Sequence, residues 1–155
     1  MRRILAVPMA LAVAGLLAAC GSPGPGTSAS PTPKDSANSG LAGTSWALTE
    51  YAASGTSGPE SVVADSTVTA VFGNDKTLSG NGGCNTYTGP FTLNGSALTF
   101  GALAATKKAC SPSITNQESA YFDALSRVAT YSIRGQVLKL RDNKGALQAG
   151  YTAAK

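Results

Sequence analysis

Apolar and polar residues alternate along the chain from residue 41 onward, in short runs that are typical of β-strands. The first run spans residues 46–51, and its alternation predicts a strand that buries Trp46 and Leu48 on one face while Ala47, Thr49 and Tyr51 lie on the other. Further short strands are expected at residues 62–63, 67–72, 77–80, 86–93 with a break at Gly89-Pro90, 97–100, 130–133, 137–140 and 146–152.

One segment has helical rather than strand spacing. Tyr121, Leu125 and Val128 recur at helical intervals, which predicts a helix with one face packed against a sheet. Thr115 with Glu118 three residues later has the pattern of a capping box, so we expect the helix to begin after Thr115 and to end near residue 129.

The order of these elements predicts a mainly β fold with a minor α component. Many short strands, hairpin turns such as Asn94-Gly95 and one principal helix favour a small antiparallel β-barrel or rolled sheet with the helix packed on it. Strands and helices do not alternate regularly, which argues against a doubly wound nucleotide-binding fold.

The N-terminal residues 1–19 have the pattern of a lipoprotein signal peptide. A basic start at Arg2 and Arg3 precedes an apolar run over 4–17 that is short for a membrane span, which needs roughly 20 residues. The run ends in Leu17-Ala18-Ala19-Cys20, which resembles a bacterial lipobox, so we expect Cys20 to carry lipid (palmitate) on the extracytoplasmic side of a bacterial cell membrane. An ordinary secretory signal with an incidental cysteine is the alternative.

Residues 20–40 contain the expected lipidated cysteine and then almost only Gly, Pro, Ser, Thr, Ala and Asn, which predicts a flexible linker. Such a linker of about 20 residues has a root-mean-square reach on the order of 25 Å. Residues 41–155 are expected to form one globular domain.

Composition excludes several classes of function. The chain has no histidine, which excludes histidine triads and histidine-containing metal sites. From Cys20 onward ten Lys or Arg face eight Asp or Glu without a large basic cluster, so we expect no nucleic-acid partner. Lys107-Lys108 is interpreted as a solvated loop, with contact to anionic lipid or wall polymer as the lesser alternative. We also expect no metal and no cofactor.

A glycine-rich stretch, 80–91, contains Cys84, and we expect this cysteine to form a disulfide with Cys110 because two cysteines in an exported domain usually pair. A reactive thiol at Cys84 is the alternative. The glycines resemble a phosphate-binding loop only superficially, since no Lys-Ser/Thr follows them and no helix begins there, so a bulge or turn is favoured.

Other candidate side chains have structural explanations. Trp46 is expected in the core rather than in a binding site, and Asn85 and Tyr87 are expected to satisfy local backbone groups and pack a strand rather than to line a pocket. Glu118 and Asp123 are spaced by five on the helix, so they point in different directions and do not form an acid–base pair.

Several of these residues occur in an order that resembles the META domain of HslJ-like bacterial lipoproteins. The resemblance covers residues 41–151 and rests on Leu41-Ala-Gly-Thr-Ser-Trp46, Gly80-x-x-Gly83-Cys84-Asn85-x-Tyr87-x-Gly89, Leu103-x-x-Thr106-x-x-Ala-Cys110, Gln117-Glu118 and Tyr131-x-Ile-x-Gly135-x-x-Leu138-x-Leu140. It implies a compact barrel-like fold, an envelope location and an association with heat shock, drug tolerance and secretion. It implies no established catalytic activity.

The sequence therefore predicts a lipid-anchored, non-enzymatic envelope protein whose domain binds or supports another envelope component. The alternative is a carrier that holds a small apolar ligand inside the barrel. A hydrolase or thiol enzyme is the third hypothesis, and the missing histidine disfavours it. The expected partners are the membrane, through the N-terminal lipid, and an unidentified envelope protein or small ligand.

Overall fold

The computed structural model describes residues 40–155 of the chain. The predicted signal peptide, Cys20 and most of the predicted linker fall outside these residues. The described part contains ten strands and one helix: β1 (Thr44–Ala52), β2 (Pro59–Ser61), β3 (Thr69–Phe72), β4 (Thr77–Asn81), β5 (Thr86–Asn94), β6 (Ala97–Phe100), β7 (Ala104–Ala105), α1 (Pro112–Ser126), β8 (Thr130–Arg134), β9 (Val137–Arg141) and β10 (Leu147–Ala153).

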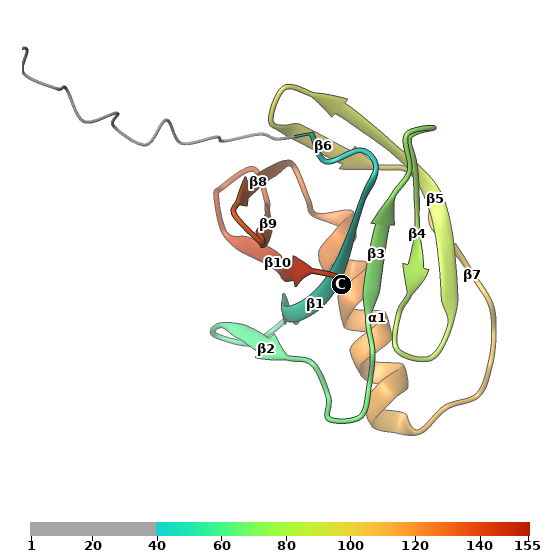
Figure 1. Ribbon diagram of the computed structural model, residues 1–155. Coiled ribbons are helices and arrows are strands. Elements are labelled where there is room, and N and C mark those ends of the chain that lie inside the picture. The colour runs from blue at the N-terminus through green and yellow to red at the C-terminus, as the bar shows by residue number, and fades with distance from the viewer. Residues whose placement is uncertain (1–39) are drawn as a thin grey trace, which may run out of the picture. The chain divides into compact units, whose positions relative to one another are not determined.

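Eight of these strands form a closed antiparallel barrel, which confirms the predicted fold class. Hydrogen-bonded neighbours run β1, β3, β4, β5, β6, β8, β9 and β10, and β10 pairs with β1 to close the ring. The short strands β2 and β7 add to β1 and β5 respectively. Closure leaves the barrel strands without free edges, which removes the usual sites of edge-to-edge association. Figure 1 shows α1 behind β1 and β3, and the helix contacts β1, β6 and β10.

The core fills the barrel and continues under the helix. Alternate residues of the strands point inward, as the pattern of Val68, Ala70 and Phe72 predicts, and all three are buried. Trp46 is buried as predicted, and its indole N–H donates to the Thr44 hydroxyl at 2.7 Å. From the helix, Tyr121 and Leu125 complete the core, and their predicted common face is confirmed. Val128 is buried in the same core, but it lies two residues beyond the end of the helix.

The first strand departs from simple alternation. Its register with β10 shifts between Leu48 and Glu50, which is a β-bulge. The extra residue reverses the direction of the following side chains, so Tyr51 is buried instead of lying with Ala47 and Thr49 on the outer face. The expectation for Tyr51 was wrong, because a strict period of two cannot represent the bulge.

Two other strand predictions need correction. The expected strand at Val62-Val63 is a loop, and the strand nearby is β2, which ends at Ser61. The predicted break at Gly89-Pro90 is absent, and β5 runs through both residues. Pro90 is tolerated because β5 changes its partner there, from β7 at Thr88 to β6 at Phe91, so the missing N–H falls between two ladders.

The helix begins three residues earlier than the start of the predicted capping box. Ser111 is the N-cap and Pro112 follows in the first turn. The helix ends at Ser126, before the predicted end near residue 129, and Arg127 is its C-cap. Proline favours the first helical position because its fixed φ suits the helix and no N–H partner is needed there. Thr115 and Glu118 therefore lie inside the helix, and the capping-box interpretation of this pair was wrong.

Candidate functional site

The glycine-rich stretch forms a tight bend between β4 and β5 at residues 82–85, here named the Cys84 bend. Gly83 has a φ of 110°, which residues other than glycine rarely adopt, and its N–H donates to Asn81 Oδ1 at 2.7 Å. Gly82 lies against α1, where a Cβ would be 2.6 Å from a carboxylate oxygen of Glu118. These two glycines allow the bend to form and the helix to approach it. The bend leads into a strand rather than a helix, which fits the predicted turn and not a phosphate-binding loop.

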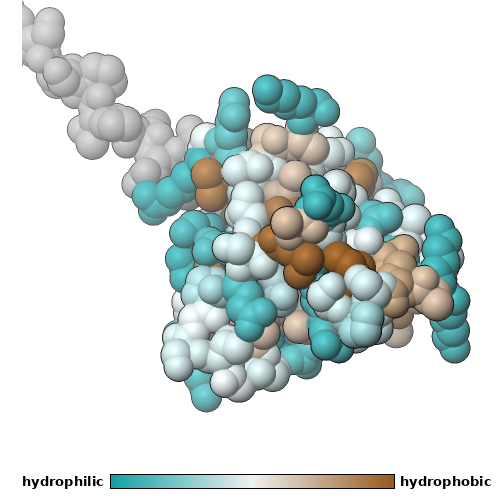
Figure 2. Space-filling view, turned by 90° about the horizontal axis from the view of Figure 1, so that it is seen from below, coloured by the Kyte–Doolittle hydropathy of each residue, from teal (hydrophilic) through white to brown (hydrophobic). Residues whose placement is uncertain are grey.

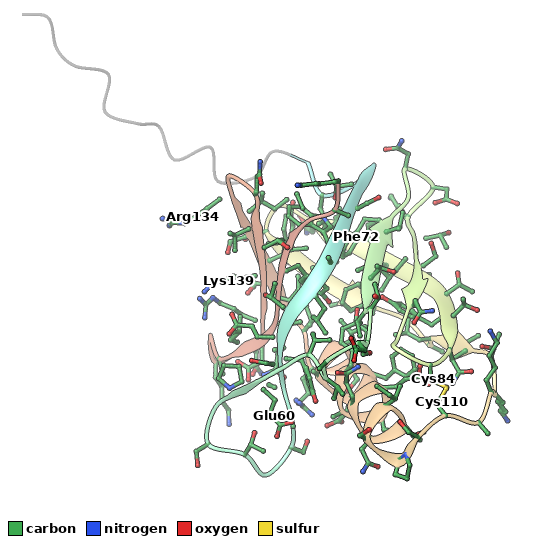
Figure 3. The ribbon with its side chains drawn as sticks, turned by 60° about the horizontal axis from the view of Figure 1, so that its bottom comes forward. Glu60, Phe72, Cys84, Cys110, Arg134 and Lys139 are labelled. Atoms are coloured by element: carbon green, nitrogen blue, oxygen red, sulfur yellow. A yellow bond between two sulfur atoms is a disulfide. The ribbon has the colours of Figure 1, made fainter. Side chains whose placement is uncertain are left out.

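A disulfide joins the Cys84 bend to the segment before the helix. Cys84 and Cys110 are bonded, with 6.0 Å between their Cα atoms and a separation of 26 positions in sequence (Figure 3). The predicted pairing is confirmed, and neither cysteine is a free thiol. Cys110 stands two residues before the start of α1, so the bond fixes the beginning of the helix on the bend.

Glu118 holds the same bend from the first turns of the helix. Its Oε2 accepts the backbone N–H groups of Asn85 at 2.6 Å and Cys84 at 3.2 Å, and its Oε1 accepts Asn85 Nδ2 at 2.6 Å. The residue is only 7% exposed, and all three donors are uncharged amides. This position explains why a carboxylate is present on the buried face of the helix: it satisfies the backbone donors that the bend leaves without strand partners.

Asn85 extends the contacts of Glu118 to a third segment. Its side-chain Oδ1 accepts the hydroxyl of Thr106 at 2.8 Å and the backbone N–H of Lys108 at 2.7 Å. The predicted local role of Asn85, the satisfaction of backbone groups, agrees with these bonds. The residues Cys84, Asn85, Thr106, Cys110 and Glu118 are named here the motif cluster, and they connect the Cys84 bend, α1 and the segment between β7 and α1.

The motif cluster is chemically saturated. Both sulfur atoms are oxidised, and no buried side-chain nitrogen or oxygen in residues 40–155 lacks a hydrogen-bond partner. Asp123 lies on the exposed face of the helix, where its carboxylate contacts Ser54 and Arg127. The hydrogen bond from the Ser54 hydroxyl, and to a lesser degree that from Arg127, lowers the pKa of the Asp123 carboxyl below its usual value. The two carboxylates thus serve different contacts. The cluster positions backbone and offers no nucleophile with a base beside it.

Gln117 adjoins Glu118 in the family pattern, and its contacts were not predicted from the sequence. It is 2% exposed, its Oε1 accepts the N–H of Val63 at 2.6 Å, and its Nε2 donates to the Ser66 hydroxyl at 2.8 Å. It holds the loop between β2 and β3 on the helix. The signal was present in the spacing, because Gln117 is four residues before Tyr121 and so lies on the apolar stripe of the helix.

Three buried tyrosines form a chain of hydroxyls through the core. Tyr87 donates to the Thr69 carbonyl at 2.8 Å, and its oxygen lies 2.8 Å from the hydroxyl of Tyr121, which lies 3.1 Å from that of Tyr151. Since each hydroxyl has one proton, Tyr121 must donate to Tyr87 and Tyr151 to Tyr121. Burial raises the pKa of all three above the ordinary value for tyrosine. Tyr87 is buried in the core, and it also lines a surface cleft of about 430 Å³ between β5 and β7, whereas it was expected not to line a pocket. The chain of hydroxyls was not predicted.

The remaining predicted residues lie around this centre. Gly89 permits a close approach of the strand to the segment after β6, since a Cβ there would be 2.7 Å from the Ala102 carbonyl oxygen. Lys107 and Lys108 are exposed on the segment before α1. Cys20 falls outside the described residues.

The clefts of the described domain are shallow features of its surface. One of about 310 Å³ lies between α1 and the segment that links β6 to β7, and its walls are partly apolar. It is lined by Phe100, Gly101, Ala102, Leu103, Phe122 and Ser126. The face in Figure 2 is largely polar, with a small group of apolar side chains near its centre.

No group of His, Cys, Asp and Glu suited to a metal ion occurs in residues 40–155, and that segment has no helix long and apolar enough to cross a bilayer.

Comparison with solved structures identifies similar folds. The chain is similar to a protein from Burkholderia xenovorans solved by NMR, with a TM-score of 0.63 and 23% identity over 74% of this chain and 84% of that one. A second NMR structure gives a TM-score of 0.53 and 23% identity over 71% of this chain and 88% of that one. At this identity the likeness concerns the fold alone.

Sequence comparison gives the family. No curated protein matches the chain significantly. The family model described as the META domain matches residues 39–153, which include every strand of the barrel, the helix and the motif cluster. The chain belongs to the META domain family.

Proposed function

We propose that this protein is anchored by lipid at Cys20 to the outer side of a bacterial cell membrane, and that its META domain binds or supports another envelope component without catalysis. The observation that carries the proposal is the order of three segments: the lipobox-like Leu17-Ala18-Ala19-Cys20, a linker of small polar residues, and a closed META barrel. A lipid anchor followed by a linker places a folded domain near a membrane surface. A role under heat or drug stress belongs to the same proposal and is supported by the family resemblance.

The motif cluster supports a structural or binding role for the domain. Its buried side-chain donors and acceptors all have partners within the protein, and its cysteines are joined, so it holds no unpaired buried side chain for a substrate. The chain also lacks histidine, the commonest acid–base residue of enzymes. A binding role at the surface is compatible with both facts.

A small-ligand carrier is less well supported. A carrier barrel needs interior space, and here large side chains such as Phe72, Tyr121 and Leu138 occupy the interior of the described domain. The feature that favours a ligand is the partly apolar cleft of about 310 Å³ beside Phe122, which is a surface feature. We therefore place binding of a protein or polymer before binding of an enclosed small molecule.

The anchoring is tested by labelling with radioactive or clickable palmitate in a bacterial host that expresses the full chain. We expect a labelled, membrane-bound product whose processing is blocked by globomycin. Cys20→Ala should lose both the label and the membrane fraction, while Cys110→Ser, which changes another cysteine, should keep both. A label that survives Cys20→Ala, or a wild-type protein released in soluble form, would contradict the anchor.

The binding role is tested by crosslinking in intact cells with the anchored protein. A photoreactive residue in place of Leu103, in the cleft, should give defined crosslinked bands if a protein partner uses it, and the same residue in place of Thr56, in the exposed loop after β1, is the control. A small extracted molecule in place of a protein band would favour the carrier. Catalytic turnover lost in a folded Glu118→Gln protein would contradict the non-enzymatic proposal.

A further inference from the structure

The positive charge of the described domain is concentrated on one hairpin. Residues 40–155 contain nine Lys or Arg, and four of these occur within residues 130–145, which cover β8, β9 and the following turn. The net charge of this segment is +3, because it contains one acidic residue, Asp142, and four basic residues: Arg134, Lys139, Arg141 and Lys144. The described domain as a whole carries only +2. The charge of the rest of the domain is therefore slightly negative.

The strand register places three of these cations, Arg134, Lys139 and Arg141, on one outer face. Arg134 is opposite Val137, and Lys139 is opposite Ser132, while the intervening residues of both strands point into the core. Cross-strand partners share a face of the sheet, so their side chains lie side by side. This face contains a shallow cleft of about 340 Å³, which is lined by Ser132, Arg134, Val137, Lys139 and Arg141. Figure 3 shows Arg134 and Lys139 on the outer side of the hairpin. This surface is named here the basic face.

Two acidic residues of the described domain, Asp142 and Glu50, lie near the basic face. The Asp142 carboxylate is held by its own turn, where Oδ1 accepts the N–H groups of Lys144 at 2.9 Å and Ala146 at 2.8 Å and Oδ2 accepts Gln148 Nε2 at 3.2 Å. Glu50 lies over Gly150, one strand beyond Lys139, and forms the acidic border of the face. Within the face, Val137 is an apolar residue that is 39% exposed among the cations.

The basic face also lies beside the point where the linker enters the domain. Gly40, the first described residue, lines a second shallow cleft together with Gly135 of the β8–β9 turn and Ala153. Gly135 directly follows Arg134. By sequence, about 20 residues separate Gly40 from Cys20, a length whose reach is on the order of 25 Å. A lipid on Cys20 would therefore keep this side of the domain within reach of the membrane surface.

We propose that the basic face docks on the anionic phospholipid headgroups of the membrane to which the protein is anchored. This inference rests on the proposed lipid anchor. Cations near an anionic leaflet strengthen binding by about fivefold for each Lys or Arg, and the effect is confined to roughly a Debye length of 10 Å. The short tether supplies the proximity, and the exposed Val137 supplies an apolar contact at headgroup depth. Docking gives the domain a fixed side toward the membrane and leaves the motif cluster free of that contact.

The test uses the chain from residue 20 to 155 with Cys20→Ser, so that lipid does not contribute, and vesicles of phosphatidylcholine with or without an equal amount of phosphatidylglycerol. We expect cosedimentation with the anionic vesicles only, weakened by salt. The double variant Arg134→Gln with Lys139→Gln should weaken binding by about tenfold to thirtyfold. The matched control Lys107→Gln with Lys108→Gln removes the same charge elsewhere and should change binding by less than about twofold.

Four outcomes would overturn the docking surface. They are equal loss in both double variants, equal binding to neutral vesicles, absence of vesicle binding, and a stronger, equally charge-dependent capture of a soluble polyanion such as wall teichoic acid. Thermal unfolding of each variant checks that the fold is intact. The outcome is separate from that of the anchor: an unlabelled Cys20 with normal vesicle binding refutes the anchor alone, and a labelled Cys20 without vesicle binding refutes the basic face alone.

Discussion

Glu118 is a buried carboxylate whose partners are amide groups. Removing a charged oxygen from water is costly unless hydrogen bonds replace its hydration, and three donors within 3.2 Å do so here. No Lys or Arg in residues 40–155 forms an ion pair with it. Two of its donors are backbone groups of the Cys84 bend, so the carboxylate and the bend fix each other's position.

This arrangement predicts a specific cost for Glu118→Gln. Both carboxylate oxygens of Glu118 accept hydrogen bonds from N–H donors. In glutamine an NH₂ group replaces one of these oxygens, so at least one N–H donor of the bend loses its acceptor. We expect a loss of about 1–3 kcal/mol in the free energy of unfolding, measured by urea denaturation. Glu60→Gln is the matched control, because Glu60 is exposed and accepts a hydroxyl from Tyr51 that an amide oxygen can also accept. Equal effects of the two substitutions would show that the buried contacts contribute nothing.

At the scale of elements, the strands with regular alternation could be predicted and the irregular ones could not. Val68, Ala70 and Phe72 reveal their strand because every second residue is buried. In β1 the bulge after Leu48 changes the period within the strand, and the sequence contains no local sign of it. The predicted start of the helix was too late, because Thr115 and Glu118 have the spacing of a capping box. The stronger signal was Pro112 directly after Ser111.

The residues of the motif cluster could be predicted better than the contacts between them. The family resemblance pointed to Cys84, Asn85, Cys110 and Glu118, and the structure brings all four together. The contacts between them depend on how close α1 comes to the Cys84 bend, which is a property of the packed elements. Gln117 could have been recognised as buried by its place on the apolar stripe, but its partners are in a distant loop.

The attachment of α1 to the Cys84 bend gives a prediction for the disulfide. In the double variant Cys84→Ser with Cys110→Ser, the closed loop of 26 residues is lost, and we expect a decrease of about 3–4 kcal/mol in the free energy of unfolding. The bonds of Glu118 and Asn85 should still hold the fold together. Amide exchange should therefore accelerate most in the bend and in residues 106–111, and little in β8–β10.

The control for this prediction is chemical. Wild-type protein treated with reductant should show the same local increase in exchange as the double variant. Alkylation of folded, exported protein without reductant should label neither cysteine, and two labelled thiols would contradict the disulfide.

For the whole domain, closure of the barrel depends on contacts that a local pattern cannot specify. The pairing of β10 with β1 joins the two ends of the domain, and β6 meets β8 across the helix that separates them in sequence. Alternation shows that each strand has an inner face, but the choice of partner depends on the packing of all the strands. The tyrosine chain illustrates this, since Tyr87, Tyr121 and Tyr151 come from β5, α1 and β10.

This chain makes the stability of the domain sensitive to alkali. Burial raises the pKa of Tyr87, Tyr121 and Tyr151 in the folded state, so these groups keep their protons at a pH where the unfolded chain has lost them. Their contribution is fully present below the unfolded value of about 10 and decreases as the pH rises above it, by up to about 1.4 kcal/mol per pH unit for each group. We expect the free energy of unfolding to fall steeply above about pH 10, with tyrosinate absorbance rising together with the loss of β-sheet circular dichroism. Tyr151→Phe removes one of these groups and should make the decrease shallower. Ionisation of all five tyrosines near pH 10 in a protein that keeps its circular dichroism would contradict a buried, hydrogen-bonded chain.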